Sequence, residues 1–268
     1  MDMRAGGGGP PRPGPAPAEP VRIGTTDWWK LAGLVLVLAD HYGLFFDPDT
    51  DGWRVVGRVA APIFFFLIGF ARTRTVPWSW IVLGVTLTAV DVWTTGEGLG
   101  KVNLNILINF AWLRLVRPYV SEHVLGRPWR VAAVALAAAA LIRPVQQVLE
   151  YGAEGWLWAL FGATQARALE TGSARDGRIR DGVAAFTAAV YAWKEIVDYD
   201  FEREDALALV PLVAGLAFLL TRFSRAESGV QPPAALVPAI RWCGRHSLEI
   251  YGISLLAMQL LGYALGET

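Results

Sequence analysis

The run Leu31-Ala-Gly-Leu-Val-Leu-Val-Leu-Ala-Asp40-His41-Tyr42-Gly43 decides how the rest of the chain is interpreted. It is apolar enough to enter a bilayer, yet it carries a carboxylic acid and an imidazole side by side. A charged side chain near the centre of a membrane helix costs roughly 2.5–3.5 kcal/mol on insertion scales. An ionisable pair kept at that cost indicates a functional site, and the alternative is a polar pair that holds two helices together.

The composition extends the membrane interpretation to the whole chain. Of its 268 residues, 54% are hydrophobic and twelve are tryptophan. Successive apolar runs separated by short charged loops are typical of a polytopic membrane protein. The single Cys243 excludes an internal disulfide and a cysteine-rich metal site. Glycine-rich pieces such as residues 96–100 neither follow a strand pattern nor precede a phosphate-loop lysine, so we expect no nucleotide fold and no nucleic-acid partner.

We expect an all-α transmembrane helix bundle of about nine spans, because membrane segments must satisfy their own backbone hydrogen bonds. Residues 1–22 form a Gly/Pro-rich tail that we expect to be disordered, and residues 23–268 are expected to form one transmembrane domain. The expected spans are residues 28–46, 55–70, 78–94, 102–118, 131–148, 156–168, 183–198, 206–222 and 248–265.

The charges of the loops predict the orientation of the bundle. With a cytoplasmic N-terminus, 18 of the 24 Lys and Arg residues fall in cytoplasmic segments, and only Arg54, Lys101 and Arg203 fall in the opposite loops. The cytoplasmic segments would be residues 1–30, 71–77, 114–130, 167–182 and 221–247. This asymmetry follows the positive-inside rule. It favours a cytoplasmic N-terminus, an external C-terminus and a multi-pass protein of the bacterial inner (cytoplasmic) membrane.

In this topology the polar residues of six spans share one depth near the outer side. They are Asp40, His41, Arg58, Asp91, Asn103, Asn105, Arg143, Lys194 and Glu195. Polar groups that only hold helices together would have no reason to share a depth, whereas groups that line a cavity open to the outer face would. We therefore expect these side chains to line such a cavity.

Within this layer, His41 is the expected general base toward an amine or hydroxyl, with Asp40 or Asp91 as the acid that orients it. The alternative is a hydrogen-bonded packing histidine. Arg58 has two interpretations: it recognises an oxyanion, or it compensates the charge of a nearby acid. For Lys194 we favour compensation of its charge by Glu195. The other two histidines fall roughly 20 Å away at 1.5 Å per helical residue, so we expect no metal site.

Arginines on the inner face form a second candidate site. Arg72, Arg74, Arg114 and Arg117 are placed to hold the phosphates of a cytoplasmic donor such as a coenzyme A thioester. The positive-inside rule alone also accounts for them.

Several of these residues lie in motifs that resemble the TraX family of integral-membrane acyltransferases. Val55-Val-Gly-Arg58-Val-Ala-Ala-Pro62-Ile-Phe-Phe-Phe66 is similar to a helix of that family, which follows a first span ending in Asp-His, here Asp40-His41. Asn103-Leu-Asn105-Ile-Leu-Ile resembles its Asn-Ile-Leu element. Gly244-Arg-His-Ser-Leu-Glu249-Ile-Tyr251 resembles the closing helix of a wider group that includes polysaccharide O-acetylating enzymes. The resemblance covers residues 27–115 and 240–265, and it departs from the family at Ala61 and Asn109.

The resemblance implies acetyl-CoA as the donor and acetyl transfer inside the membrane. The expected catalytic residues are then His41, Asp40, Arg58 and Asp91, and the expected donor-binding residues are Arg72, Arg74, Arg114, Asn105 and Asn109. In this scheme Arg58 or Asn105 polarises the thioester carbonyl, and His41 either removes a proton from the acceptor or takes the acetyl group itself. The acceptor is a protein N-terminus, a glycan or a small molecule, and an oligomer is compatible with the sequence. A small transporter or proton-coupled channel that uses the same polar layer is the alternative function.

Overall fold

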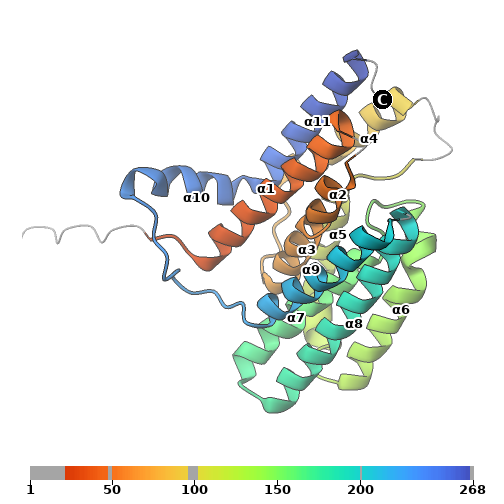
Figure 1. Ribbon diagram of the computed structural model, residues 1–268. Helices are drawn as coiled ribbons and strands as arrows, with labels where there is room; N and C mark the ends of the chain where they lie inside the picture. Colours follow the sequence, from red (N-terminus) through yellow and green to blue (C-terminus); the bar gives the residue numbers. More distant parts are fainter. Residues whose placement is uncertain (1–21, 48–49, 96–101, 200, 266–268) are drawn as a thin grey trace, which may run out of the picture.

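A computed structural model describes residues 22–47, 50–95, 102–199 and 201–265, and the regular secondary structure of this part is helical apart from two isolated bridges (Figure 1). The helices are α1 (Thr25–Phe46), α2 (Asp51–Gly57), α3 (Ala60–Phe70), α4 (Trp78–Thr95), α5 (Ile106–His123), α6 (Pro128–Gln146), α7 (Glu154–Thr171), α8 (Ala174–Tyr199), α9 (Arg203–Thr221), the 3₁₀ helix η2 (Ala234–Leu236), α10 (Val237–Arg245) and α11 (Ser247–Leu265). The tail expected at residues 1–22 lies almost entirely outside the described residues.

Five helical segments of the described chain are long and apolar enough to cross a membrane. They are α1, residues Gly52–Phe70 (α2 with α3), α6, α9 and α11. The protein is therefore all-helical, as expected, and these segments indicate a membrane protein. Each of the nine expected ranges overlaps a helix, but α4, α5, α7 and α8 do not meet the same criterion. The number of spans stays a prediction.

The centre of the molecule is the contact between α3 and α7. Every residue of α3 is buried, against α7 on one side and α1 and α5 on the others. A Cβ atom on Gly69 would lie 1.8 Å from the carbonyl oxygen of Ala159, and one on Gly162 would lie 2.0 Å from that of Phe66. Only glycine allows two helix backbones to approach this closely. The α3–α7 contact is therefore the closest backbone packing among these helices.

The helix of the second apolar run is interrupted at Arg58, and the sequence explains why. Pro62 has no backbone N–H, so the carbonyl of Arg58, four residues earlier, cannot receive its helical hydrogen bond. The hydroxyl of Tyr191 in α8 donates to this carbonyl instead, at 2.6 Å. α2 therefore ends at Gly57 and α3 begins at Ala60, which leaves Arg58 at the break between them.

Two groups of helices lie on either side of α3 in Figure 1. α1 packs with α11, and α11 with α4, while α7 packs with α6 and α8, and α8 with α9. Both α2 and α3 contact α1, and α2 also contacts α9. Polar residues on α1, α2 and α8 are therefore brought together between the two groups.

The short helix α10 is not among the expected elements, because residues 221–247 were expected to form only a loop. In Figure 1 it runs across the beginning of α1 rather than along it. Gly244 lies where a Cβ would come within 2.9 Å of the Asp27 carboxylate, so α10 is seated on the first turn of α1. Trp242 on α10 is 58% exposed. An apolar-run search misses such a helix because it is amphipathic and only nine residues long.

Candidate functional site

A polar cavity of about 560 Å³ lies among α1, α2, α4, α8 and the segment before α7. We call it the polar cavity. The residues predicted for one layer that line it are Asp40, His41, Arg58, Asp91, Asn103, Asn105 and Lys194. Arg143 is the exception among the predicted bases, because its side chain is 55% exposed and pairs with Asp198 at the edge. The structure thus brings together residues from five separate expected spans.

Asp40 and Arg58 form a buried ion pair at the wall of this cavity. Nη2 of Arg58 lies 2.7 Å from both carboxylate oxygens of Asp40. Nη1 of Arg58 donates to the hydroxyl of Tyr199 at 2.6 Å, and the guanidinium lies over the Tyr199 ring. Arg54 also approaches the carboxylate of Asp40, at 3.6 Å. Of the two interpretations of Arg58, the geometry favours compensation of the Asp40 charge.

A second charge cluster continues from this pair into α7 and α8. Nζ of Lys194 lies 2.9 Å from Glu154, 3.0 Å from Glu195 and 3.3 Å from Asp198. Glu195 in turn lies 3.6 Å from Nη1 of Arg58. Together with Arg54 and Arg143, these residues form a network of four bases and four acids in which opposite charges alternate. Lys194 is therefore compensated by Glu195, as favoured from the sequence, and also by Glu154.

His41 is placed differently from its neighbour. Its Nδ1 atom is buried and has no hydrogen-bond partner among the described residues. Its ring lies 5.6 Å from the ring of Tyr251 in α11, measured between centroids. The carboxylate of Asp40 is held by arginines, so Asp40 does not orient the imidazole by a hydrogen bond within the described chain. Asp91 lines the same cavity.

Asn105 joins three elements at the wall of the cavity. Its side-chain oxygen caps α5 by accepting the N–H of Leu107, and its amide donates to Glu150 at 2.9 Å and to the Tyr251 hydroxyl at 3.3 Å. Glu150 also accepts the N–H of Ile106. Burial raises the pKa of Glu150 to about 7, while the hydrogen bond from Ile106 acts in the opposite direction. All the polar atoms of the Asn105 side chain are therefore used by the protein.

Asn109, predicted to bind the donor, lies one turn deeper and is fully buried. Its amide donates to the carbonyls of Glu150 and Gly152, and its oxygen accepts the indole N–H of Trp156. These bonds hold a segment that includes Tyr151, whose φ of 61° lies in the left-handed region that non-glycine residues rarely adopt. The geometry gives Asn109 a positioning role for Tyr151, which lines the polar cavity.

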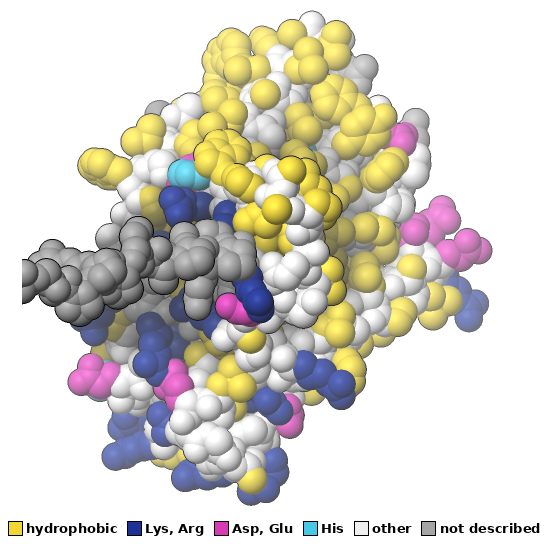
Figure 2. Space-filling view, turned by 90° about the vertical axis from the view of Figure 1, so that its left-hand side faces the viewer, with side chains coloured by type: hydrophobic (Ala, Val, Ile, Leu, Met, Phe, Trp, Pro, Cys, Tyr) yellow, Lys and Arg dark blue, Asp and Glu magenta, His cyan; other side chains and the backbone are white. Residues whose placement is uncertain are grey.

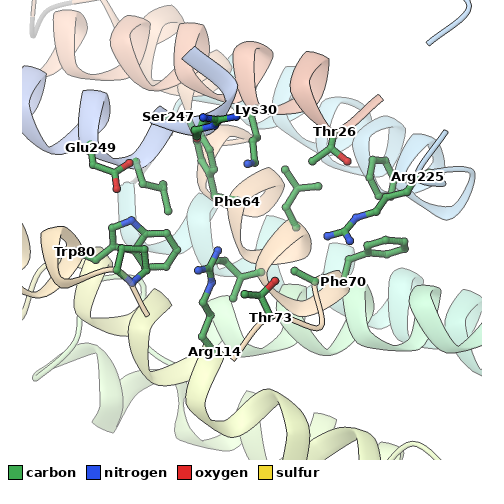
Figure 3. Close-up of a pocket in the computed structure, with 17 residues that line it drawn as sticks. Thr26, Lys30, Phe64, Phe70, Thr73, Trp80, Arg114, Arg225, Ser247 and Glu249 are labelled. Carbon is green, nitrogen blue, oxygen red and sulfur yellow. The ribbon is translucent and has the colours of Figure 1, made fainter. Parts of the chain in front are cut away.

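A second cavity of about 280 Å³ lies near the beginning of α1, and we call it the basic vestibule (Figure 3). Figure 3 shows Lys30 of α1 and Arg114 of α5 pointing toward each other across it, with Arg225 at one side. Arg245 of α10 and one acid, Glu249, also line it. The guanidinium of Arg114 lies 4.2 Å from the ring of Trp80. Lys30, Arg225 and Arg245 were not among the predicted site residues, because only their positive charge, and not their proximity, is visible in the sequence.

Arg72 and Arg74 do not line the basic vestibule. They lie at a separate surface cavity with Arg117 and Arg167, where Arg72 pairs with Glu170 and Arg117 donates to the carbonyl of Gly69. Of the four arginines placed to hold donor phosphates, the structure therefore has only Arg114 in the vestibule. Figure 2 shows Lys and Arg side chains spread over the middle and lower parts of this side of the molecule, below an almost wholly apolar upper part.

A third, small cavity lies between the basic vestibule and the polar cavity, and we call it the passage. It has a volume of about 20 Å³ and shares Phe64 and Leu248 with the vestibule. It shares Asp40, His41, Glu150 and Tyr151 with the polar cavity, and Tyr251 also lines it. The His41 imidazole is thus situated where the passage meets the polar cavity.

Comparisons of the chain with protein-family models, with curated proteins and with solved structures give no match. The chemistry of the site is accordingly inferred from its own residues.

The Asp40–Arg58 pair leads to a stability prediction. The variant Asp40→Asn should unfold at a clearly lower temperature in detergent, because a buried guanidinium that loses its partner costs about 3–5 kcal/mol. Adding Arg58→Gln should recover part of this loss, since it removes the uncompensated charge. The matched control is Glu204→Gln, which neutralises an exposed acid of α9 and should change little. Equal unfolding temperatures for all these variants would show that the pair does not stabilise the fold.

Proposed function

We propose that the chain is a membrane-embedded acyltransferase that moves an acetyl group from acetyl-CoA to an amine or hydroxyl acceptor. The observation that carries this proposal is the position of His41, which lines both the polar cavity and the passage beside the basic vestibule and whose Nδ1 has no hydrogen-bond partner among the described residues. Two substrates of different chemistry can approach such a group from opposite sides. The resemblance of the Asp40-His41 and Arg58–Pro62 motifs to the TraX family supports the same reaction class.

In this proposal the basic vestibule receives the donor. Lys30, Arg114, Arg225 and Arg245 offer four positive charges against one carboxylate, Glu249, and this excess suits the phosphates of a coenzyme A thioester. The passage is narrow, and its lining toward the vestibule includes the apolar residues Phe64 and Leu248, which suits a thin uncharged arm. The thioester would then lie beside His41.

In the proposed chemical step, His41 acts as the general base. A ring nitrogen of His41 takes the proton of the acceptor amine or hydroxyl while the acceptor atom attacks the thioester carbonyl carbon. The carbon–sulfur bond breaks, and the imidazolium returns the proton to the departing thiolate. The two-step alternative, in which His41 carries the acetyl group between donor and acceptor, uses the same residue.

A donor of a hydrogen bond to the thioester carbonyl is also required, and the two residues expected to provide it are occupied. Arg58 is held by Asp40 and Tyr199, and the amide of Asn105 is used by Glu150 and Tyr251. The Tyr251 hydroxyl accepts its bond from Asn105 and retains its own proton. We assign the stabilisation of the developing oxyanion to Tyr251, which lines the passage beside His41.

The orientation belongs to the same proposal. The basic vestibule would face the cytoplasm, where coenzyme A thioesters are made, and the polar cavity would open toward the outer side of the bacterial inner membrane. The distribution of Lys and Arg, 18 of 24 on one side, supports this orientation.

The first prediction of the proposed function concerns His41. Membranes that contain the protein should transfer label from acetyl-CoA to an endogenous acceptor, and His41→Ala should reduce the rate at least about 100-fold, because general base catalysis contributes that much or more. His123→Ala is the matched control, since His123 is exposed at the end of α5. Coenzyme A should raise the unfolding temperature of wild type and of both variants. Full activity of His41→Ala, or no effect of coenzyme A on wild type, would contradict the proposal, and proton flux into liposomes that depends on His41 would favour the transporter instead.

The second prediction concerns Tyr251. Tyr251→Phe should lower kcat by about 100-fold with little change in KM for acetyl-CoA, as expected when one oxyanion donor is removed. Tyr263→Phe serves as the control, because that tyrosine is 44% exposed near the end of the same helix. An unchanged kcat in Tyr251→Phe beside an inactive His41→Ala would reject the role of Tyr251 and leave the reaction class standing.

The third prediction tests the orientation. Alkaline phosphatase, which becomes active only outside the cytoplasm, should be active when fused after residue 268 and inactive when fused after residue 75. Activity in the reverse pattern would place the basic vestibule on the outer side, where no coenzyme A thioester is available to it.

A further inference from the structure

A groove of about 890 Å³ runs along the surface of the helix pair α8 and α9, and it shares no lining residue with the polar cavity. Its floor is made of small side chains on α8, at positions 184, 185, 188, 189 and 192, all alanine. Its other wall is formed by Val210, Ala214, Ala217 and Phe218 of α9. The hollow exists because the α8 floor of the groove, together with Ala214 and Ala217 on the α9 side, carries only methyl side chains.

One end of the groove is polar and basic. Arg180, Asp181, Thr221 and Arg222 line it there. Arg180 is fixed by Gln165 and by the carbonyl of Thr221, at 3.2 and 3.3 Å, and it pairs with Asp181. Arg222 is exposed and stacks on the ring of Phe218, 4.1 Å from its centroid, and the described residues offer it no acidic partner. The end therefore carries one positive charge that the described chain does not neutralise.

The groove has the length of one bilayer leaflet. From Arg180 to Ala192 there are twelve residues of α8, or about 18 Å at 1.5 Å per residue. Half of a hydrocarbon core of about 30 Å is about 15 Å. The wall of the groove belongs to α9, a candidate membrane span of which only 28% is buried inside the protein. The groove thus faces lipid, with its basic end at the level of the headgroups.

We propose that this groove binds one anionic phospholipid of the leaflet adjoining Arg222. An acyl chain would lie over the alanines of α8, and the phosphate would be held by Arg222. The combination of a leaflet-long apolar groove and an unneutralised arginine at its headgroup end distinguishes this occupant from a zwitterionic lipid. The proposal does not depend on the catalytic role of His41.

A second copy of the chain is the competing occupant, because small residues spaced by four often allow membrane helices to pack closely. In a twofold dimer in one membrane, however, both copies lie at the same depth. Their Arg180 and Arg222 ends would then face each other and repel. The charge at the end of the groove therefore favours a lipid over a second copy.

Native mass spectrometry of the detergent-solubilised protein tests the proposal with phosphatidylglycerol and phosphatidylcholine of identical acyl chains. Wild type should bind the first phosphatidylglycerol at least about fivefold more tightly than phosphatidylcholine, and Arg222→Gln should remove this preference, since a basic residue near a headgroup contributes about a fivefold effect. Arg178→Gln, an exposed arginine on the first turns of α8, should keep the preference. Equal binding of the two lipids by wild type would overturn the proposal.

A groove-filling variant provides the second arm of the test. Ala189→Trp should abolish the first tight lipid site, whereas Leu136→Trp, which places the same ring on the exposed face of α6, should retain it. Unchanged lipid binding by Ala189→Trp would overturn the proposal. So would a wild-type dimer that Ala189→Trp dissociates, because it would assign the groove to a second copy.

Discussion

The ion pair between Asp40 and Arg58 is the interaction on which the arrangement of the other helices depends. It requires α1 and α2 to touch, and Gly57 allows this, since a Cβ there would come within 2.2 Å of the Asp40 side chain. It also requires Arg58 to leave a regular helix, and Pro62 causes that break. The carbonyl of Arg58, which Pro62 leaves without its helical partner, accepts a hydrogen bond from Tyr191 of α8. Pro62 therefore places Arg58 where its carbonyl contacts α8 and its guanidinium contacts Asp40 of α1.

The same pair explains why we assign the charged residues of the polar cavity a structural role and not a catalytic one. Lys194, Arg58 and their acidic partners neutralise one another. Removing one buried charge from such a network destabilises the fold, because its partner is left buried and uncompensated. Charges that are fully compensated hold the walls of the cavity and fix its shape. His41 differs from them because no ion pair within the described chain holds its imidazole, and its Nδ1 has no hydrogen-bond partner there. The imidazole is therefore left available for the proton transfer that the proposed reaction requires.

Much of the fold could be predicted from the sequence, because apolar runs that must satisfy their own backbone become helices. The shared depth of Asp40, His41, Arg58 and Asn105 was also predictable, since it depends only on topology and helical rise. The basic vestibule was not, because Lys30, Arg225 and Arg245 come from distant segments whose contact depends on how α10 is seated on α1. Likewise, no sequence signal marks Tyr151, whose backbone conformation is imposed by hydrogen bonds from Asn109.

The geometry of α1 restricts the kind of donor that the proposed reaction can use. Lys30 lines the basic vestibule and His41 lines the polar cavity, and eleven residues of one helix separate them, or about 16 Å along its axis. A donor in which the acyl group is bonded directly to a phosphate could not place its charge at one site and its carbonyl at the other. A donor with a long, thin and uncharged arm can do so through the passage beside Phe64 and Leu248. The distance between the two cavities therefore favours an acyl carrier of the coenzyme A type over a small acyl phosphate.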